Sequence, residues 1–372
     1  MMNDKLDNLN LEQLKELRDK LEDKISFCNT QQLNRKILAN AFYGSLANKY
    51  SRWYDIRIPT SITKTGQDYI KYIAKNVSDF INEKVGNNID KNLIVSGDTD
   101  SIFVSVYDYV KKYCQNMNKK EIVEKLIEFD KEIQLFISLK LKEYGKKHNI
   151  YEDLIDMKRE NIIDKALWVA KKRYVYKVLV DEANVYDENR KYKLKGLELV
   201  KSNTPKIVKK YLFNSLEYIM NNDFKGLYQY VTTIKKEWVD LTPEEIAFPT
   251  IVNMEKYWNR NKDNLQLSYK KGAQSHVKGS IFFNELCMKN KLNNDLIKDK
   301  DKIKYVYLLD NPLKIDSLSF KNEYPIELLE KKYIDYNEHF EKLFIDKIKI
   351  MIKSLDWNLD NVEKKEIAKK FL

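Results

Sequence analysis

The sequence has little cysteine and no long apolar run. Its three cysteines, Cys28, Cys114 and Cys287, stand far apart and form no CxxC pair. Neither a disulfide framework nor a structural zinc site is therefore predicted, and a reducing cytoplasm fits. No stretch approaches the roughly 18 apolar residues that a membrane-spanning helix needs. Met1 is followed by polar residues rather than the apolar region of a signal peptide, so we expect a soluble, intracellular protein with no membrane partner.

The overall charge favours an anionic partner. The 372 residues include 67 Lys and Arg against 56 Asp and Glu, which leaves a formal net charge of +11. Each phosphate that such a surface neutralises releases condensed counterions, so nucleic acid is the leading candidate. Charge that serves only solubility explains the composition about equally well. A hydrophobic content of 43% excludes wholesale disorder, and the length predicts several compact units.

Helical patterns dominate the N-terminal part. A polar cap signal precedes apolar residues at helical spacing, which predicts a helix over residues 11–28. After the polar stretch 29–31, a second helix is expected to end at Gly44, and the short link predicts a helical hairpin. A further amphipathic helix is expected over residues 64–84, before a Gly-Asn-Asn stop signal.

Strand patterns begin after this helix, and the mixture predicts an α+β fold. Residues 92–106 place β-branched, apolar runs on both sides of a Gly-Asp turn signal, which predicts a β-hairpin. Residues 166–180, rich in Val and Tyr, are typical of one half-buried strand. Other expected elements are a helix over 120–147, helices from 197 to about 240, a strand near 303–309 and long helices after Pro325. No internal repeat is present.

Two carboxylates stand at the turn of the predicted hairpin. Asp98 and Asp100 are two residues apart, so an extended backbone would direct both side chains to one face. Two bare charges there repel by on the order of 2 kcal/mol, and a divalent cation reverses that sign. Oxygen-only ligands favour Mg²⁺ or Mn²⁺. A solvated turn is the ordinary alternative for an isolated Asp-Thr-Asp, but the apolar arms on both sides favour a functional pair.

Two basic patterns complete the candidate sites. Lys36, Asn40 and Tyr43 are spaced to share one helix face beside Gly44, which suits a nucleoside triphosphate, although the spacing alone favours a solvated face with a half-buried Tyr. The run Lys171, Lys172, Arg173 and Tyr174 enters an apolar strand, where a phosphate backbone lying across the sheet explains it better than a solvated face. Strand alternation would place Lys172 with Tyr174 on one face and Lys171 with Arg173 on the other.

Several segments resemble family B DNA polymerases, closest to those of T-even-type bacteriophages. GDTDS is similar to motif C, with Ser96 where many relatives carry Tyr, and NTQQLNRKILANAFYGSLANKY is similar to motif B. The resemblance implies template-directed addition of a dNTP to a primer 3′-hydroxyl with two metal ions. It implies that Asp100 is the shared metal ligand, that Asp98 supports it, and that Lys36 and Asn40 contact the triphosphate. Tyr43 and Gly44 would contact the nascent base pair.

The same resemblance implies DNA contacts further along the chain. KKRY is similar to a motif that contacts the primer end, which gives this role to Lys172 and Tyr174. DMKREN resembles a segment whose glutamate lies near the metals, so Glu160 becomes an auxiliary ligand, although Lys158 replaces a common Asp. Phosphate contacts at the palm-to-thumb junction would come from Lys201, Ser202, Thr204 and Lys206. The segment SHVKG adds His276 and Lys278, and a C-terminal tail ending in Phe371 and Leu372 is a candidate for binding a sliding clamp.

The sequence also lacks parts that the resemblance requires. No segment is similar to motif A, which carries the second catalytic aspartate, or to the proofreading exonuclease and the first fingers helix. We therefore expect a split polymerase, inactive without a separate upstream polypeptide and acting in the host cytoplasm if viral. The expected parts are partial fingers at 1–48, palm at 49–196 and thumb at 197–372. A non-catalytic DNA-binding remnant or accessory subunit is the alternative, whereas a different carboxylate-dependent nuclease leaves motif B and KKRY unexplained.

Overall fold

The structure, a computed structural model, contains helices and antiparallel sheets, as expected for an α+β fold. It describes residues 10–88, 90–152, 155–182, 184–185, 192–260, 264–292 and 295–359. The chain divides into two compact units, Met1–Lys158 and Arg159–Leu372. This division falls inside the segment expected to be the palm, 49–196. The boundaries expected for fingers, palm and thumb stay a prediction.

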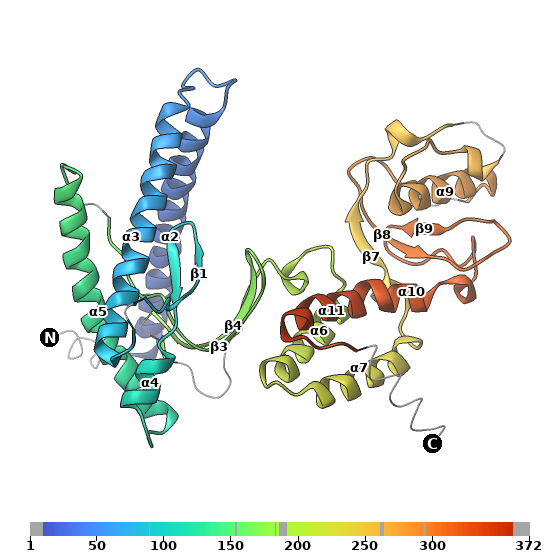
Figure 1. Cartoon of the computed structure of the whole chain (residues 1–372). Helices are drawn as coiled ribbons and strands as arrows, with labels where there is room; N and C mark the ends of the chain where they lie inside the picture. Colours follow the sequence, from blue (N-terminus) through green and yellow to red (C-terminus); the bar gives the residue numbers. More distant parts are fainter. Residues whose placement is uncertain are drawn as a thin grey trace, which may run out of the picture. The chain divides into compact units, whose positions relative to one another are not determined.

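Helices and a β-hairpin make up the described residues of the first unit (Figure 1). Its elements are α2 (Leu11–Ala47), α3 (Arg57–Val85), β1 (Ile94–Asp98), β2 (Ser101–Val104), α4 (Tyr107–Tyr113) and α5 (Lys119–Lys147). Its core is built on α3, where Ile73, Val77 and Ile81 are buried. Tyr109 of α4 stacks on Phe129 of α5, with ring centroids 3.7 Å apart. Helix α3 ends at Gly86, which has the positive φ of 76° that an αL cap requires.

The predicted helical hairpin within residues 1–48 is wrong, because α2 is one continuous helix of 37 residues. The polar stretch 29–31 contains no Gly or Pro, so nothing in its backbone stops a helix. The Thr30 hydroxyl also donates to the Ser26 carbonyl 2.9 Å away, one turn back along the same helix. Helix α2 instead runs beside α3 (Figure 1), and none of its side chains is buried.

In the second unit, the described residues form two antiparallel sheets with helices packed against them. Its first sheet contains β3 (Asn161–Ala170), β4 (Arg173–Asp181), β5 (Asn184–Val185) and β6 (Tyr192–Lys195), with β4 paired to the other three. Its second sheet has the order β7 (Phe248–Ile251), β8 (Lys302–Tyr307) and β9 (Ser317–Phe320). The α-helices are α6 (Lys206–Met220), α7 (Phe224–Trp238), α8 (Pro243–Ile246), α9 (Ser275–Lys289), α10 (Tyr336–Phe340) and α11 (Asp346–Ile352).

Short helical turns complete this unit. They are the 3₁₀ helices η1 (Glu198–Val200), η2 (Glu255–Tyr257), η3 (Leu265–Leu267), η4 (Lys331–Tyr333) and η6 (Lys353–Leu355), and the π-helical segment η5 (Glu341–Ile345). The η5 segment continues directly from α10 into α11. The helical region expected after Pro325 is therefore continuous over residues 336–352, with a π-helical turn in its middle.

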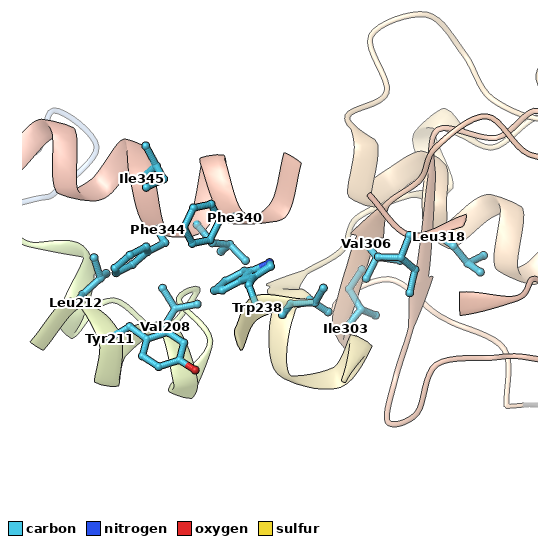
Figure 2. Close-up of a cluster of buried hydrophobic side chains, with 14 of the residues drawn as sticks. Val208, Tyr211, Leu212, Trp238, Ile303, Val306, Leu318, Phe340, Phe344 and Ile345 are labelled. Carbon is cyan, nitrogen blue, oxygen red and sulfur yellow. The ribbon is translucent and has the colours of Figure 1, made fainter. Parts of the chain in front are cut away.

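One hydrophobic core joins the helices and the second sheet of this unit (Figure 2). Trp238 of α7 is 1% exposed. Its ring lies 5.3 Å from that of Phe340 in α10 and 6.5 Å from that of Tyr211 in α6, measured between centroids. Ile303 and Val306 of β8 belong to the same cluster. Their burial fixes β8, and with it the second sheet, against the helices.

The predicted single strand at 166–180 is wrong, because β3 and β4 form a hairpin whose turn is Lys171–Lys172. Lys172 has a φ of 60°, a conformation that Lys rarely adopts. Residues 166–180 contain no Gly, Pro or Asn to mark a turn. The sequence pattern therefore predicts one unbroken strand. The predicted assignment of Lys171 and Lys172 to opposite faces of a strand is wrong for the same reason.

Candidate nucleic-acid and nucleotide interface

The acidic pair lies at the tip of the hairpin β1–β2, as the sequence predicts. Asp98 ends β1 opposite Ser101 of β2, so Thr99 and Asp100 form the turn. Thr99 has a φ of 60°, and the Asp100 amide donates to the Asp98 carbonyl over 2.7 Å. The chain turns between the two aspartates, so Asp100 is not part of a strand. Strand alternation therefore does not place both carboxylates on one face. Asp98 is half-buried and Asp100 is exposed.

The carboxylates of this turn suit a hard cation but do not enclose one. Oxygen ligands fit Mg²⁺ or Mn²⁺, and an exposed Asp100 leaves room for an ion to approach. Among the residues that the structure describes, no group of three or more His, Cys, Asp or Glu side chains could hold a metal ion. The auxiliary candidate Glu160 is exposed and belongs to the second unit, where its carbonyl accepts from the Glu182 amide over 2.7 Å.

The nucleotide candidates lie on the exposed surface of α2. Lys36, Asn40, Tyr43 and Gly44 are all exposed, and the continuous helix gives the first three the shared face that their spacing predicts. The Tyr43 hydroxyl lies 2.9 Å from the Thr63 hydroxyl of α3 and shares a hydrogen bond with it. This bond holds the phenol ring at the edge of the α2–α3 pair.

The turn of the β3–β4 hairpin is held by a close approach that sequence reasoning missed. A Cβ atom at Gly196 would lie 2.2 Å from the Lys172 carbonyl oxygen and 3.1 Å from Cγ of Arg173. Gly196 also has a φ of 65°, so both space and backbone conformation require glycine. The segment after β6 therefore packs directly against the KKRY turn. A glycine that follows a strand and precedes a basic segment is the sequence signal that could have indicated it.

Charged residues from the two segments meet at this point. The Glu198 carboxylate accepts from Arg173 over 3.3 Å and from Lys201 over 2.8 Å. Lys195 pairs with Tyr174 across the strands, and its ammonium lies 5.8 Å from the Tyr174 ring centroid. Lys171 and Lys172 are exposed at the turn. Two predicted DNA-contacting segments thus form one basic cluster, with Glu198 as an acidic residue inside it.

Two of the predicted DNA contacts are less accessible than expected. Tyr174 is only 8% exposed, so its ring packs in the sheet and does not project outward. Thr204 is 7% exposed, and its hydroxyl donates to the Glu198 carbonyl over 2.9 Å. Ser202 and Lys206 are exposed, and they leave the junction as a surface that phosphate can reach.

His276 and Lys278 occupy the first turn of α9. The Lys278 ammonium donates to the Asp316 carboxylate over 2.6 Å, and this hydrogen bond raises the Lys278 pKa. Burial lowers the pKa of His276. The predicted clamp-binding residues Phe371 and Leu372 lie outside the described residues. Across the part of the chain that is described, no helix is long and apolar enough to span a membrane.

A basic cluster built from two chain segments is typical of proteins that bind nucleic-acid phosphates. A sequence model of DNA polymerase family B matches residues 11–355, and the chain belongs to this family. It is 29% identical to the DNA-directed DNA polymerase of Enterobacteria phage T4 over 364 residues, which cover 92% of this chain and 39% of the relative. The predicted membership of this family is thereby confirmed.

Two further relatives extend the comparison. The DNA-directed DNA polymerase of Escherichia phage RB69 is 36% identical over 194 residues, which cover 49% of this chain and 21% of the relative. The DNA polymerase of Pyrococcus glycovorans is 25% identical over 243 residues, which cover 65% of this chain and 26% of that protein. The chain thus spans well under half the length of these relatives.

Proposed function

We propose that this chain is the C-terminal portion of a DNA-directed DNA polymerase, which adds dNTPs to a primer 3′-hydroxyl under the direction of a template. The observation that carries the proposal is the family match across residues 11–355, which contains the α2 face, the acidic turn and the KKRY turn in one order. The phage relatives that match are DNA-directed DNA polymerases by name.

The proposed catalytic roles follow the motifs. Asp100 is the metal ligand shared by two ions, Asp98 supports it, and Glu160 is an auxiliary ligand. When bound, Mg²⁺ or Mn²⁺ would activate the attacking hydroxyl and neutralise charge on the triphosphate. Lys36 and Asn40 hold the triphosphate, a role supported by their exposure on one helix face. The unbroken α2 fixes the backbone positions from which their cation and amide project.

The basic cluster is the proposed site for the primer-template backbone. Lys171, Lys172 and Arg173 supply positive charge at a turn that Gly196 and β6 hold in place. Phosphate contacts of this kind fix the register of a duplex without reading its sequence, which suits a polymerase. The further proposed contacts are Lys201, Ser202, Lys206, His276 and Lys278, whereas the buried Tyr174 and Thr204 support this surface from beneath.

A separate polypeptide that carries motif A and the exonuclease is the proposed partner. Two-metal transfer needs carboxylates on both sides of the ions, and Asp98 with Asp100 supplies one side. Apolar side chains are exposed along α2, including Leu21 and Ile25 at 51% and 59%, which suits contact with another helix. Clamp binding by the tail stays part of this proposal, as do the partial fingers, palm and thumb and action in a host cytoplasm.

Primer extension tests this function. We expect extension only when the chain is mixed with a polypeptide that supplies motif A, and we expect Asp100→Ala to abolish it. Asp90→Ala, at an exposed position of the same unit, is the matched control and should leave extension intact. Extension that survives Asp100→Ala contradicts the proposal. Tight primer-template binding without extension in any mixture would instead favour a non-catalytic, DNA-binding remnant.

A further inference from the structure

The loop that joins α2 to α3, residues 48–56, exposes a group of aromatic rings. Tyr50 is 86% exposed, Trp53 is 52% exposed and Tyr54 is 44% exposed. Large rings left in water at one loop are unusual, because burying each one would remove a large apolar area from solvent. The loop follows the helix that carries Tyr43 and Gly44, and it lies at one end of the α2–α3 pair (Figure 1).

Hydrogen bonds hold this loop in a defined conformation. The Asp55 amide donates to the Leu46 carbonyl over 3.1 Å and closes the loop across its base. The Ser51 hydroxyl lies 2.7 Å from the Ser45 hydroxyl and also accepts from the Trp53 amide over 3.2 Å. These bonds use the backbone and the serines. The exposed rings are therefore presented on a scaffold that does not depend on them.

Cations accompany the rings. The Arg52 guanidinium lies 4.2 Å from the Trp53 ring centroid, and the Lys49 ammonium lies 5.0 Å from that of Tyr50. The acidic residue of the loop, Asp55, accepts two hydrogen bonds from the Arg57 guanidinium, of 2.9 and 2.6 Å. Its charge is therefore matched by the first residue of α3. Aromatic rings interleaved with cations are the pattern by which proteins hold unpaired bases and their phosphates.

We propose that Tyr50 and Trp53 form a stacking platform for unpaired bases of single-stranded DNA, with Lys49 and Arg52 on the flanking phosphates. The inference rests on the proposed function and deepens it, because a polymerase must hold the template strand beyond the nascent base pair. The ligand is single-stranded DNA of any sequence, since every base has a face on which a ring can stack. Aromatic rings with Arg also occur in protein interfaces, but the surplus of cations in this loop favours a polyanion.

Binding of oligonucleotides to the whole chain tests the platform without requiring catalysis. Fluorescein-labelled oligo-dT is compared by anisotropy with an abasic strand of the same length, which keeps the phosphates and lacks the bases. Wild-type protein should prefer oligo-dT. Tyr50→Ala or Trp53→Ala should weaken binding to oligo-dT by roughly 5- to 100-fold and leave binding to the abasic strand unchanged. Tyr50→Phe should keep the wild-type preference for oligo-dT, because a phenyl ring also stacks on bases.

Tyr107→Ala is the matched control, because Tyr107 of α4 is 69% exposed in the same unit and should have no effect on either strand. Equal binding of both strands by the wild type would overturn the proposal, as would ring variants that leave oligo-dT binding unchanged. Loss of association with the upstream polypeptide, with DNA binding intact, would identify the loop as a protein contact and also overturn it. Primer extension with Asp100→Ala is a separate measurement, so failure here is distinguishable from failure of the proposed function.

Discussion

Replacing Gly196 with alanine should destabilise the second unit and displace the KKRY turn. A Cβ there would lie 2.2 Å from the Lys172 carbonyl oxygen, far inside van der Waals contact, so the turn or the segment after β6 must move. The positive φ of 65° costs about 1 kcal/mol for alanine, and overpacking adds about 1–3 kcal/mol. We therefore expect a loss of roughly 2–4 kcal/mol in the free energy of unfolding.

Thermal and urea unfolding measure this loss, and duplex DNA binding measures the displacement of the turn. Gly272→Ala is the matched control, because Gly272 has a φ of 90° but no neighbour within 4 Å of a Cβ atom. It should therefore show the cost of the backbone conformation without the clash. Duplex binding should weaken in Gly196→Ala alone. A Gly196→Ala variant as stable as Gly272→Ala, with unchanged duplex binding, would refute the reasoning.

Three further predictions concern charge and burial. Burial lowers the pKa of His339 from 6.5 to about 4, so the unfolded chain takes up the proton first and stability should fall by about 3 kcal/mol as the pH drops from 6.5 to 4. His339→Gln should flatten that dependence in urea unfolding, whereas the exposed control His148→Gln should not. Glu198→Gln should free Arg173 and Lys201, strengthen duplex binding and steepen its salt dependence by about one charge, whereas an unchanged salt slope would contradict the assigned pairing. Cys28 is exposed and the other two cysteines are buried, so an aromatic disulfide reagent should modify one thiol rapidly in the native chain, and fast reaction of more than one would contradict this burial.

The local elements were the easiest to predict, because their signals lie within a few residues. Helix α5 spans Lys119–Lys147, close to the predicted 120–147, since a capping Asn118 and an apolar stripe occur in sequence. The polar composition at 29–31 predicts a break in the helix of residues 1–48, and this prediction is wrong. Asn, Thr and Gln lower helix propensity by tenths of a kcal/mol each. That cost is too small to end a helix that carries strong helix formers on both sides.

The basic cluster could be predicted only in part, because its geometry depends on contacts between distant segments. The residues KKRY indicate phosphate binding by type, but their turn exists because β4 pairs with β6 and because Gly196 admits the Lys172 carbonyl. Neither contact leaves a periodic signal in the sequence. The role of Glu198 could not be predicted from its own segment either, because it depends on ion pairs with both Arg173 and Lys201. Since Glu198 pairs with Arg173 and Lys201, it limits the positive charge that this proposed DNA-binding surface offers to phosphate.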